Sequence, residues 1–504
     1  MSGADVRWWW AAALAAVAGL VSAAAFDPWS VPYAMVVGVA VLVGTLRAQR
    51  DARLPAVLLT GAVFGASFMA PLIWWMNAVS NGAYVALVLA QTVLLAVIAV
   101  PLRAVLRLPW WPLWGAAAWV LGEQVRGGFP FSGFPWGRLA HTTIDTPLAP
   151  WARLLGMPGT SALVFVLAAM LVVLAGRGIV RRGAAVAVVV AAVVAGLLLP
   201  TGLAGPGPER RIAAVQGNTP GAFLTWPRGA IGELHLAETD RYADAVESGT
   251  ERVPDLVIWP ENSLDVDPFA DPLLAGRIER LAQRIGAPIL LGGILDGATN
   301  DTAYNAGVVW DAEGPGEVYV KRKLVPYGEY VPFRRELGDL VPRVDRDIPR
   351  DMLPGDEPGD LQAGSTVVGD TICWDIAYDG IVQEAVRGGA EVLVVQTSNA
   401  SFTGTAQPAQ QFKISRLRAI ETGRWVVVPS TNGISGIVDA DGRVVAQAPT
   451  EEPATLVADV GTATGSTIAT RLGRWPALVL CGVGLLGWAL GFRSLRRARR
   501  ERAA

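Results

Sequence analysis

The sequence predicts a polytopic α-helical membrane domain of about eight spans, joined to an α/β layered domain of roughly 250 residues. Two observations lead to this fold class. Hydrophobic residues make up 52% of the 504-residue chain and charged residues only 17%, a composition too apolar for an ordinary soluble protein. Acidic residues nevertheless concentrate between about 208 and 465, where short β-rich runs alternate with helical patterns.

The membrane part is defined by apolar runs that are long enough to cross a hydrocarbon core of roughly 30 Å. For the first run, a secretory signal is an alternative, because Arg7 precedes its apolar core and residues 22–25 resemble a small-residue cleavage site. Removing that run would leave the orientation of the others unchanged. The runs lie near residues 8–25, 32–46, 55–76, 83–102, 109–122, 159–176, 184–203 and 474–492.

Arginine-rich loops predict how these spans are oriented, since cytoplasmic loops carry an excess of Lys and Arg. Arginines follow the second, fourth, sixth and last runs, which are alternate loops, so both chain ends are expected on the cytoplasmic side. The chain is thus predicted to be a multi-pass protein of the cell (plasma or inner) membrane. We expect an N-terminal membrane domain at 1–207 with about seven spans, an extracytoplasmic α/β domain at 208–465, and a last span with a basic cytoplasmic tail at 466–504.

The predicted external loop at 123–158 is rich in aromatic residues and proline, with Phe-Pro-Phe at 129–131 and Gly-Phe-Pro-Trp-Gly at 133–137. Such a segment suits the headgroup level of a bilayer, either as an ordinary interfacial belt or as a lip that guides lipid chains toward a site. Glu123 and Arg126 fall at the edge of a span rather than at mid-depth. Because transporters need ionisable residues inside their spans, we interpret the membrane part as an anchor and a lipid-facing scaffold.

The region after the Gly/Pro-rich linker at 202–208 alternates between strand-like runs and helical patterns. This alternation, with added hairpins, predicts a layered α/β domain that is large enough to bury its own core. Helices are expected near 229–248, 270–285, 381–388 and 406–422. Strands are expected at 212–216, 256–259, 288–293, 306–310, 317–320, 367–373, 392–396, 425–429, 434–438 and 444–448.

Cys373 is the residue around which this region is organised, because it follows an apolar, alternating run and is expected just past the end of a strand. The other cysteine, Cys481, lies in an apolar run and is interpreted as a packing residue, which argues against a disulfide. A nucleophilic cysteine needs a base, yet the two histidines, His141 and His235, are both interpreted as structural, the latter on a surface helix. A cysteine–histidine pair, a metal site, a cofactor and a nucleic-acid surface are therefore not expected.

Two other strand ends carry better partners for the thiol. Residues 255–261 end a strand with a proline and place Glu261 at its mouth, and residues 317–321 end another strand with Lys321. Polar residues at the carboxyl ends of strands gather over one edge of a layered sheet, so Glu261, Lys321 and Cys373 are expected to converge. A desolvated carboxylate can take the thiol proton, while the ammonium favours the thiolate and then the oxyanion that forms when sulfur attacks a carbonyl. This set predicts acyl transfer through a thioester.

These residues, in this order, resemble the signatures of the carbon–nitrogen hydrolase (nitrilase) superfamily. Within that superfamily, membrane spans on both sides of the domain resemble the apolipoprotein N-acyltransferase family, and the resemblance covers nearly the whole chain. The most discriminating matches are the segments 324–329 and 410–421. The full set is Val-Gln-Gly-Asn at 215–218, Trp-Pro-Glu-Asn at 259–262, Lys321, Leu-Val-Pro-Tyr-Gly-Glu at 324–329, Cys373, Ser-Asn at 398–399, and 410–421 with Arg416 and Arg418.

The resemblance implies a nitrilase-like αββα sandwich that is catalytic, with Glu261 as general base, Lys321 as transition-state stabiliser and Cys373 as nucleophile. It implies that an acyl chain leaves a phospholipid for Cys373 and is then taken as an amide by the α-amine of a diacylglyceryl-cysteine lipoprotein. A polyprenol-sugar synthase is a candidate partner, as in fused relatives. Substrate-binding or supporting roles carry over to Glu329, Asn305, Trp226, Trp374, Asp375, Ser398 and Asn399.

The chain departs from the family pattern in two places. Trp374 and Asp375 follow the cysteine where the family commonly has Tyr-Glu, and Ala-Ser-Phe at 400–402 replaces more usual acidic and tryptophan residues. These changes concern contacts at the rim of the substrate site and leave the triad intact. Two alternatives stay open: a membrane-tethered amidase or nitrilase that acts on small amides, and a noncatalytic scaffold that retains the fold.

Overall fold

The computed structural model describes residues 7–202, 204–221, 226–334 and 348–503. The chain divides into two compact units, a helical unit of Met1–Leu199 with Leu472–Ala504 and an α/β unit of Pro200–Arg471. The two units are joined twice, because the chain leaves the helical unit after its seventh long helix and returns to it for the last one.

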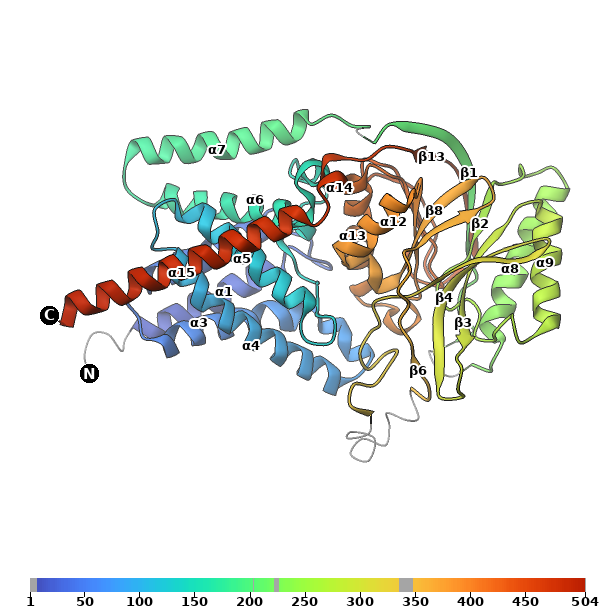
Figure 1. Cartoon of the computed structure of the whole chain (residues 1–504), viewed down its shortest axis with the longest axis horizontal. Coiled ribbons are helices and arrows are strands. Elements are labelled where there is room, and N and C mark those ends of the chain that lie inside the picture. The colour runs from blue at the N-terminus through green and yellow to red at the C-terminus, as the bar shows by residue number, and fades with distance from the viewer. Residues whose placement is uncertain (1–6, 203, 222–225, 335–347, 504) are drawn as a thin grey trace. The chain divides into compact units, whose positions relative to one another are not determined.

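The helical unit is built from long helices at the positions of the predicted apolar runs (Figure 1). Among the residues that the structure describes, five helices are long and apolar enough to cross a membrane, and two others are shorter apolar helices. A polytopic helical domain is therefore confirmed, while the number of spans stays a prediction. The helices are α1 (Arg7–Ala23), α2 (Ala34–Ala48), α3 (Leu54–Leu72), α4 (Asn81–Val105), α5 (Trp111–Gly128), α6 (Ala152–Ala175), α7 (Ile179–Leu198) and α15 (Trp475–Ala503).

The last helix, α15, packs against α4 and α5 through glycines. A Cβ atom added at Gly484 would lie 2.8 Å from the carbonyl oxygen of Ala117, and one added at Gly491 would lie 2.6 Å from that of Ala104. Real Cβ atoms do not come so close, so glycine at these positions lets the helix backbones approach one another. The C-terminal helix is in this way an integral part of the helical unit.

Glu123 and Arg126 lie in the last turns of α5, but they are buried. Glu123 Oε1 accepts hydrogen bonds from the backbone N–H of Leu139 at 2.8 Å and from Trp119 Nε1 at 3.0 Å. Arg126 Nε donates to Gln91 Oε1 at 2.7 Å. A charge removed from water needs such partners, so these two residues tie the segment after α5 to the helices.

The aromatic segment that follows α5 divides into an exposed tip and a buried part. Phe129 and Phe131 are exposed, whereas Trp136 is buried and packs against Trp75 with ring centroids 5.9 Å apart. The expected belt or lip therefore cannot include Trp136, which belongs to the interior of the helical unit. The reason is that Arg126 holds the carbonyl oxygen of Trp136 at 3.0 Å and draws this part of the segment inward.

The α/β unit has two sheets, with strand orders β13-β1-β2-β3-β4-β5 and β12-β11-β10-β9-β8-β7; β6 pairs with β4. Its helices are α8 (Ala230–Glu247), α9 (Pro272–Ile285), α12 (Asp379–Gly388), α13 (Gln407–Thr422) and α14 (Ile468–Leu472). Its strands are β1 (Pro206–Gln216), β2 (Leu256–Ile258), β3 (Ile289–Asp296), β4 (Thr302–Asp311), β5 (Gly314–Val320), β6 (Asp351–Met352), β7 (Asp360–Ala363), β8 (Thr366–Ile372), β9 (Val392–Gln396), β10 (Val426–Val428), β11 (Gly436–Val438), β12 (Val444–Gln447) and β13 (Ala454–Ala463).

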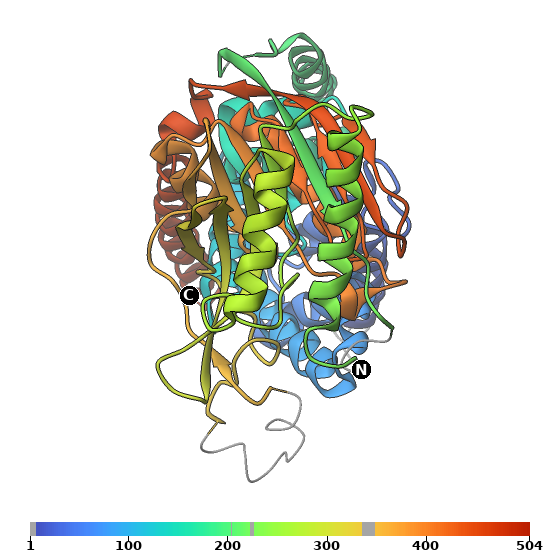
Figure 2. The ribbon, with the colours of Figure 1, turned by 90° about the vertical axis from the view of Figure 1, so that its right-hand side faces the viewer.

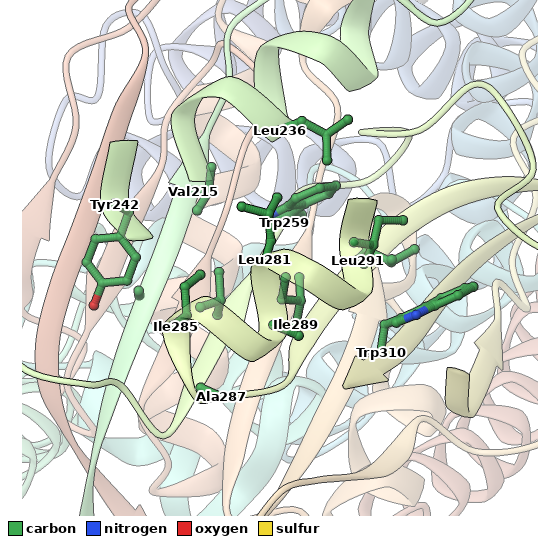
Figure 3. Close-up of a cluster of buried hydrophobic side chains, with 14 of the residues drawn as sticks. Val215, Leu236, Tyr242, Trp259, Leu281, Ile285, Ala287, Ile289, Leu291 and Trp310 are labelled. Atoms are coloured by element: carbon green, nitrogen blue, oxygen red, sulfur yellow. The ribbon is translucent and has the colours of Figure 1, made fainter. Parts of the chain in front are cut away.

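Helices cover the outer face of each sheet. Figure 2 shows α8 and α9 side by side over the first sheet, while α12 and α13 pack against β8 and β10 of the second. In Figure 3, Leu236 of α8 and Leu281 of α9 lie close to Trp259, which follows β2, in a buried cluster that extends to Trp310 of β4. A second core, which includes Leu290, lies between the two sheets. The order of helices, sheet, sheet and helices confirms the αββα sandwich.

Every strand and helix expected in this unit is present, and three strands were not expected. These are β6, β7 and β13, the last of which pairs antiparallel with β1 along most of its length. His235 lies on a helix at the surface of the unit, as expected, but its side chain points inward. Its side chain is fully buried, its Nδ1 lies 2.8 Å from the carbonyl oxygen of Ile231, and its ring lies 6.1 Å from that of Trp259, because it falls on the face of α8 that covers the sheet.

Leu290→Ala is expected to lower the free energy of unfolding by about 2–5 kcal/mol, because it opens a cavity between the sheets where Leu290 is fully buried. The measurement is thermal denaturation of the full-length protein in detergent. Val445→Ala is the matched control, since Val445 is 51% exposed on β12 and its truncation should change stability by less than about 0.5 kcal/mol. Equal effects of the two variants would contradict a shared core between the sheets.

Candidate active site

The candidate site lies where strands of both sheets end. Strands β2 and β3 are parallel, and the chain reverses at β4 and again at β5, so β2 and β5 end at the same edge of the first sheet. Glu261 follows β2 and Lys321 follows β5 directly. In the second sheet, β8 and β9 are parallel and are followed by Cys373 and Thr397. Alternation along each strand then directs every second side chain into the layer between the sheets.

Lys321 lies between two carboxylates. Its Nζ is 2.8 Å from Oε1 of Glu261 and 3.0 Å from Oε1 of Glu329, and the residue is only 1% exposed. Burial alone lowers the pKa of Lys321, but the charges of Glu261 and Glu329 outweigh burial and hold that pKa well above its ordinary value. The lysine is therefore a permanently charged group inside the protein.

Asn305 and Ser398 fix the carboxylates around this lysine. Asn305 Nδ2 donates to Oε1 of Glu261 and to Oε1 of Glu329, both at 2.8 Å. The backbone N–H of Ser398 donates to Oε2 of Glu261 at 2.8 Å. Since Asn305 belongs to the first sheet and Ser398 follows a strand of the second, the Glu261 carboxylate is held from both sheets.

Glu329 closes a turn as well as contacting the lysine. Its Oε2 accepts a hydrogen bond from the backbone N–H of Val325 at 2.8 Å, and the backbone N–H groups of Gly328 and Glu329 donate to the carbonyl oxygen of Val325. Tyr327, at the tip of this turn, has a φ of 59° and is 39% exposed. The turn therefore connects the buried charges to the surface of the α/β unit.

Cys373 begins a short 3-10 helix, η4 (Cys373–Ala377), directly after β8. Its φ is 50°, a left-handed conformation that is uncommon for any residue other than glycine. The thiol Sγ donates to Gln411 Oε1 at 3.9 Å. Burial and then Glu261 raise the pKa of Cys373 to about 12, although Lys321 and a hydrogen bond with Thr397 lower it. The resting thiol is thus protonated.

Asp375 anchors the turn that carries the thiol. Its Oδ2 accepts a hydrogen bond from the Tyr319 hydroxyl at 2.7 Å, and its Oδ1 accepts one from the backbone N–H of Lys323 at 3.0 Å. Burial raises the pKa of Asp375 to about 6, against the opposing effects of Lys321 and the Tyr319 hydroxyl. A carboxylate at neutral pH, Asp375 links η4 to the end of β5.

Arg418 of α13 holds the other end of the same turn. Its Nε donates to the carbonyl oxygen of Ile376 at 2.9 Å and its Nη2 to that of Ala377 at 3.1 Å. The guanidinium is fully buried and pairs with Asp379 at 2.8 Å and with Glu421 at 2.5 Å. Charge-assisted hydrogen bonds of this kind restrict the turn at both backbone positions.

Trp374, Asn399 and Trp226 are the other residues that the sequence predicts for the site. Trp374 Nε1 donates to the Tyr378 hydroxyl at 2.9 Å. Asn399 Nδ2 donates to Gln407 Oε1 at 3.1 Å, so its side chain belongs to a buried amide network rather than to the carboxylates. Trp226 is half-buried in the connection between β1 and α8, and its role stays a prediction.

Thr397 and Gln411 are neighbours of the thiol that were not predicted from the sequence. Gln411 Nε2 donates to Thr397 Oγ1 at 3.1 Å, and Gln411 Oε1 accepts from Gln407 Nε2 at 2.7 Å. The sequence carries a signal for Gln411, because glutamines at 407, 410 and 411 share one face at the start of α13. Among the residues that the structure describes, no group of three or more His, Cys, Asp or Glu is arranged to hold a metal ion.

Comparison with known proteins places the chain in a family. The model of the apolipoprotein N-acyltransferase N-terminal domain matches residues 18–170, and the carbon-nitrogen hydrolase model matches residues 211–469. A protein named apolipoprotein N-acyltransferase from Mycolicibacterium smegmatis is 36% identical over 84% of this chain and 76% of that protein. The chain belongs to the apolipoprotein N-acyltransferase family. A relative of that name from Pseudomonas putida is 30% identical over 95% of both chains.

Membership in the apolipoprotein N-acyltransferase family covers both units, since one family model falls in the helical unit and the other in the α/β unit. Among solved structures, an amidase of the nitrilase superfamily from Nesterenkonia AN1 is similar to 52% of this chain and 94% of its own, at 19% identity and a TM-score of 0.37. The family assignment identifies the protein as a membrane acyltransferase that is related to the enzymes modifying lipoproteins.

The alkylation rate of Cys373 by iodoacetamide is expected to rise about tenfold per pH unit between pH 7 and pH 11 without a plateau, because the thiolate fraction grows in this way below a pKa of about 12. Peptide mass spectrometry after timed alkylation measures it. Cys373→Ala serves as the control for labelling at Cys481. A plateau of the alkylation rate near pH 8 would mean that the resting thiol is already ionised, and would contradict the raised pKa of the buried Cys373.

Proposed function

We propose that this protein N-acylates the diacylglyceryl-cysteine amino terminus of apolipoproteins, with a phospholipid as acyl donor and a thioester on Cys373 as intermediate. The observation that supports this most strongly is the buried contact of Lys321 with Glu261 and Glu329 beside the Cys373 thiol. A nucleophile, a base and a fixed cation are the groups that acyl transfer requires. The names of the relatives supply the substrate class.

In the first half of the reaction, Glu261 takes the proton from Cys373 while sulfur bonds to the carbonyl carbon of a phospholipid ester. Lys321 keeps its charge, so it stabilises the oxyanion of the tetrahedral intermediate. The carbon–oxygen bond of the ester then breaks, and the departing alcohol oxygen takes the proton from Glu261. The products are a lysophospholipid and an acyl group on Cys373.

In the second half, the neutral α-amine of the lipoprotein attacks the thioester carbonyl. Glu261 accepts a proton from the attacking nitrogen, and the carbon–sulfur bond breaks as the tetrahedral intermediate collapses. The Cys373 thiolate takes back the proton, which leaves an amide on the lipoprotein and the free thiol. The same base and cation therefore serve both halves of a ping-pong reaction.

The surrounding residues have positioning roles in this proposal. Glu329 keeps Lys321 charged, because its Oε1 contacts the ammonium. Asn305 fixes both carboxylates around the lysine, because its Nδ2 donates to Oε1 of Glu261 and to Oε1 of Glu329. The backbone of Ser398 orients the Glu261 carboxylate. The rim of the substrate site is assigned to the side chains of Trp226 and Trp374. The buried Asp375 and Asn399 support that rim indirectly, Asp375 through the backbone N–H of Lys323 and Asn399 through the side chain of Gln407.

Incubation of the purified protein with a phospholipid of defined acyl chain is expected to add the mass of one acyl group to Cys373, as measured by intact-mass and peptide spectrometry. A diacylglyceryl peptide should then remove that mass and appear as the N-acylated product. Cys373→Ala should gain no mass, and Cys481→Ala, the matched control, should behave like the wild type, because Cys481 is outside the α/β unit.

Each alternative function gives a different result. An unchanged mass in folded wild-type protein, together with hydrolysis of small amides, would favour a membrane-tethered amidase. Unchanged N-acylation of lipoproteins in cells that carry only Cys373→Ala would favour a noncatalytic scaffold. Either result would refute the proposed reaction.

We also propose that the α/β unit lies on the extracytoplasmic face of the cell membrane, which the alternation of arginine-rich loops supports. Leu273→Cys in a protein without Cys373 and Cys481 should react with a membrane-impermeant maleimide in intact cells, because Leu273 is 82% exposed on the α/β unit. Arg50→Cys, on an exposed loop of the helical unit, should react only after permeabilisation. The opposite labelling pattern would mean that the α/β unit lies on the cytoplasmic face. A polyprenol-sugar synthase is a candidate partner on the resemblance alone.

A further inference from the structure

Asp370 and Gln396 are fully buried polar residues that the proposed reaction does not use. Asp370 lies on β8 shortly before Cys373, and Gln396 is the last residue of β9. Within the described part of the chain, neither carboxyl oxygen of Asp370 nor Oε1 of Gln396 accepts a hydrogen bond of good geometry. A buried carboxylate without donors is costly, so this pair requires an explanation.

The unpaired oxygens of the two residues open onto the same place on β4 of the opposite sheet. A Cβ atom added at Gly307 would overlap Oδ2 of Asp370 and would lie 2.7 Å from Oε1 of Gln396. Both oxygens thus border the space that glycine leaves free between the sheets. Two acceptor oxygens that face the same space repel one another unless a proton lies between them.

The orientation of the Gln396 amide is fixed by a third group. Its Nε2 donates to the carbonyl oxygen of Trp259 at 2.7 Å, across the layer between the sheets. Rotating the amide by half a turn would set its oxygen against that carbonyl oxygen, which is again two acceptors without a proton. A proton on Asp370 would give Gln396 Oε1 a donor while Nε2 keeps its hydrogen bond with Trp259.

We propose that Asp370 is a protonated carboxylic acid in the resting protein, donates a hydrogen bond to Gln396 Oε1, and through Gln396 positions the backbone of Trp259, two residues before Glu261. The proton on Asp370 completes a chain of donors from β8 through β9 to the end of β2. Asp370 is then a positioning residue for the general base, and this part of the inference rests on the proposed function.

A neutral Asp370 also limits the negative charge near Lys321. Burial and then Asp375 raise the pKa of Asp370 well above its ordinary value and outweigh the opposing effect of the Thr371 backbone N–H, so the acid keeps its proton at neutral pH. An ionised Asp370 would add another anion to the region around Lys321, and would disfavour the thiolate further. The carboxylates that already interact with that ammonium are Glu261, Glu329 and Asp375.

The presence of the proton on Asp370 is tested by infrared spectroscopy of the full-length protein in a detergent without ester groups. At about pH 8, the wild type is expected to show the C=O band of a protonated carboxylic acid, and Asp370→Asn should lack it. Asp375, whose pKa is raised to about 6, is ionised at that pH. Asp311→Asn, at an exposed position that ends β4, is the matched control and should keep the band. Identical spectra of wild type and Asp370→Asn would overturn the proposal.

The positioning role is tested with two variants that differ in one donor. Asp370→Asn retains an N–H donor for Gln396 and is expected to keep kcat within about threefold, whereas Asp370→Val has no donor and should lose about tenfold or more in kcat with little change in KM. Equal losses in the two variants would overturn the positioning role. Should Asp370→Val fail to fold, the infrared comparison still decides whether the proton is present.

These measurements separate the inference from the proposed reaction. A wild type that shows the Asp370 band but forms no acylated peptide would refute the reaction and leave the proton in place. A wild type that forms the acylated peptide without the band would refute the inference alone.

Discussion

The buried ammonium of Lys321 is the interaction on which the α/β unit depends. Removing this charge from water is costly unless opposite charges are fixed within hydrogen-bond distance, and Glu261 and Glu329 meet that condition at 2.8 and 3.0 Å. The two carboxylates come from different connections, one after β2 and one in the turn after β5. They reach the same ammonium only when the strands of the first sheet are in register, which Asn305 on β4 enforces by contacting both carboxylates.

Burial acts in opposite directions on the two groups that would react. It raises the pKa of Cys373 to about 12 and so keeps the thiol protonated, while paired carboxylates keep Lys321 charged despite the same burial. A thiol in this state becomes a nucleophile only as its proton is taken, which couples its reactivity to the presence of an acyl substrate. This property suits the proposed reaction, in which the acyl chain of the donor would displace water on arrival.

The sequence predicted the position of a site residue correctly where that position depends on a single strand. Glu261, Lys321 and Cys373 each follow an apolar run, so the alternation of apolar and polar residues and the turn residues after each run predicted their places at strand ends. The burial of His235 and of Trp136 did not follow, because it depends on which face of α8 covers the sheet and on the Arg126 hydrogen bond. The residues that contact the thiol from other elements were missed for the same reason: Thr397 lies after the neighbouring strand and Gln411 on a helix face, and local sequence pattern does not encode contacts of that range.

The proposed base and nucleophile belong to different sheets, so the distance between the sheets is itself part of the site. Two donors that follow or end β9, the Gln396 amide and the Ser398 backbone N–H, bind the connection after β2 at 2.7 and 2.8 Å. Sheets packed face to face are held apart mainly by apolar side chains, which tolerate small changes in spacing. Directional hydrogen bonds at the edge remove that tolerance where the reaction would occur. Residues of the inter-sheet layer can therefore govern acyl transfer without touching either substrate.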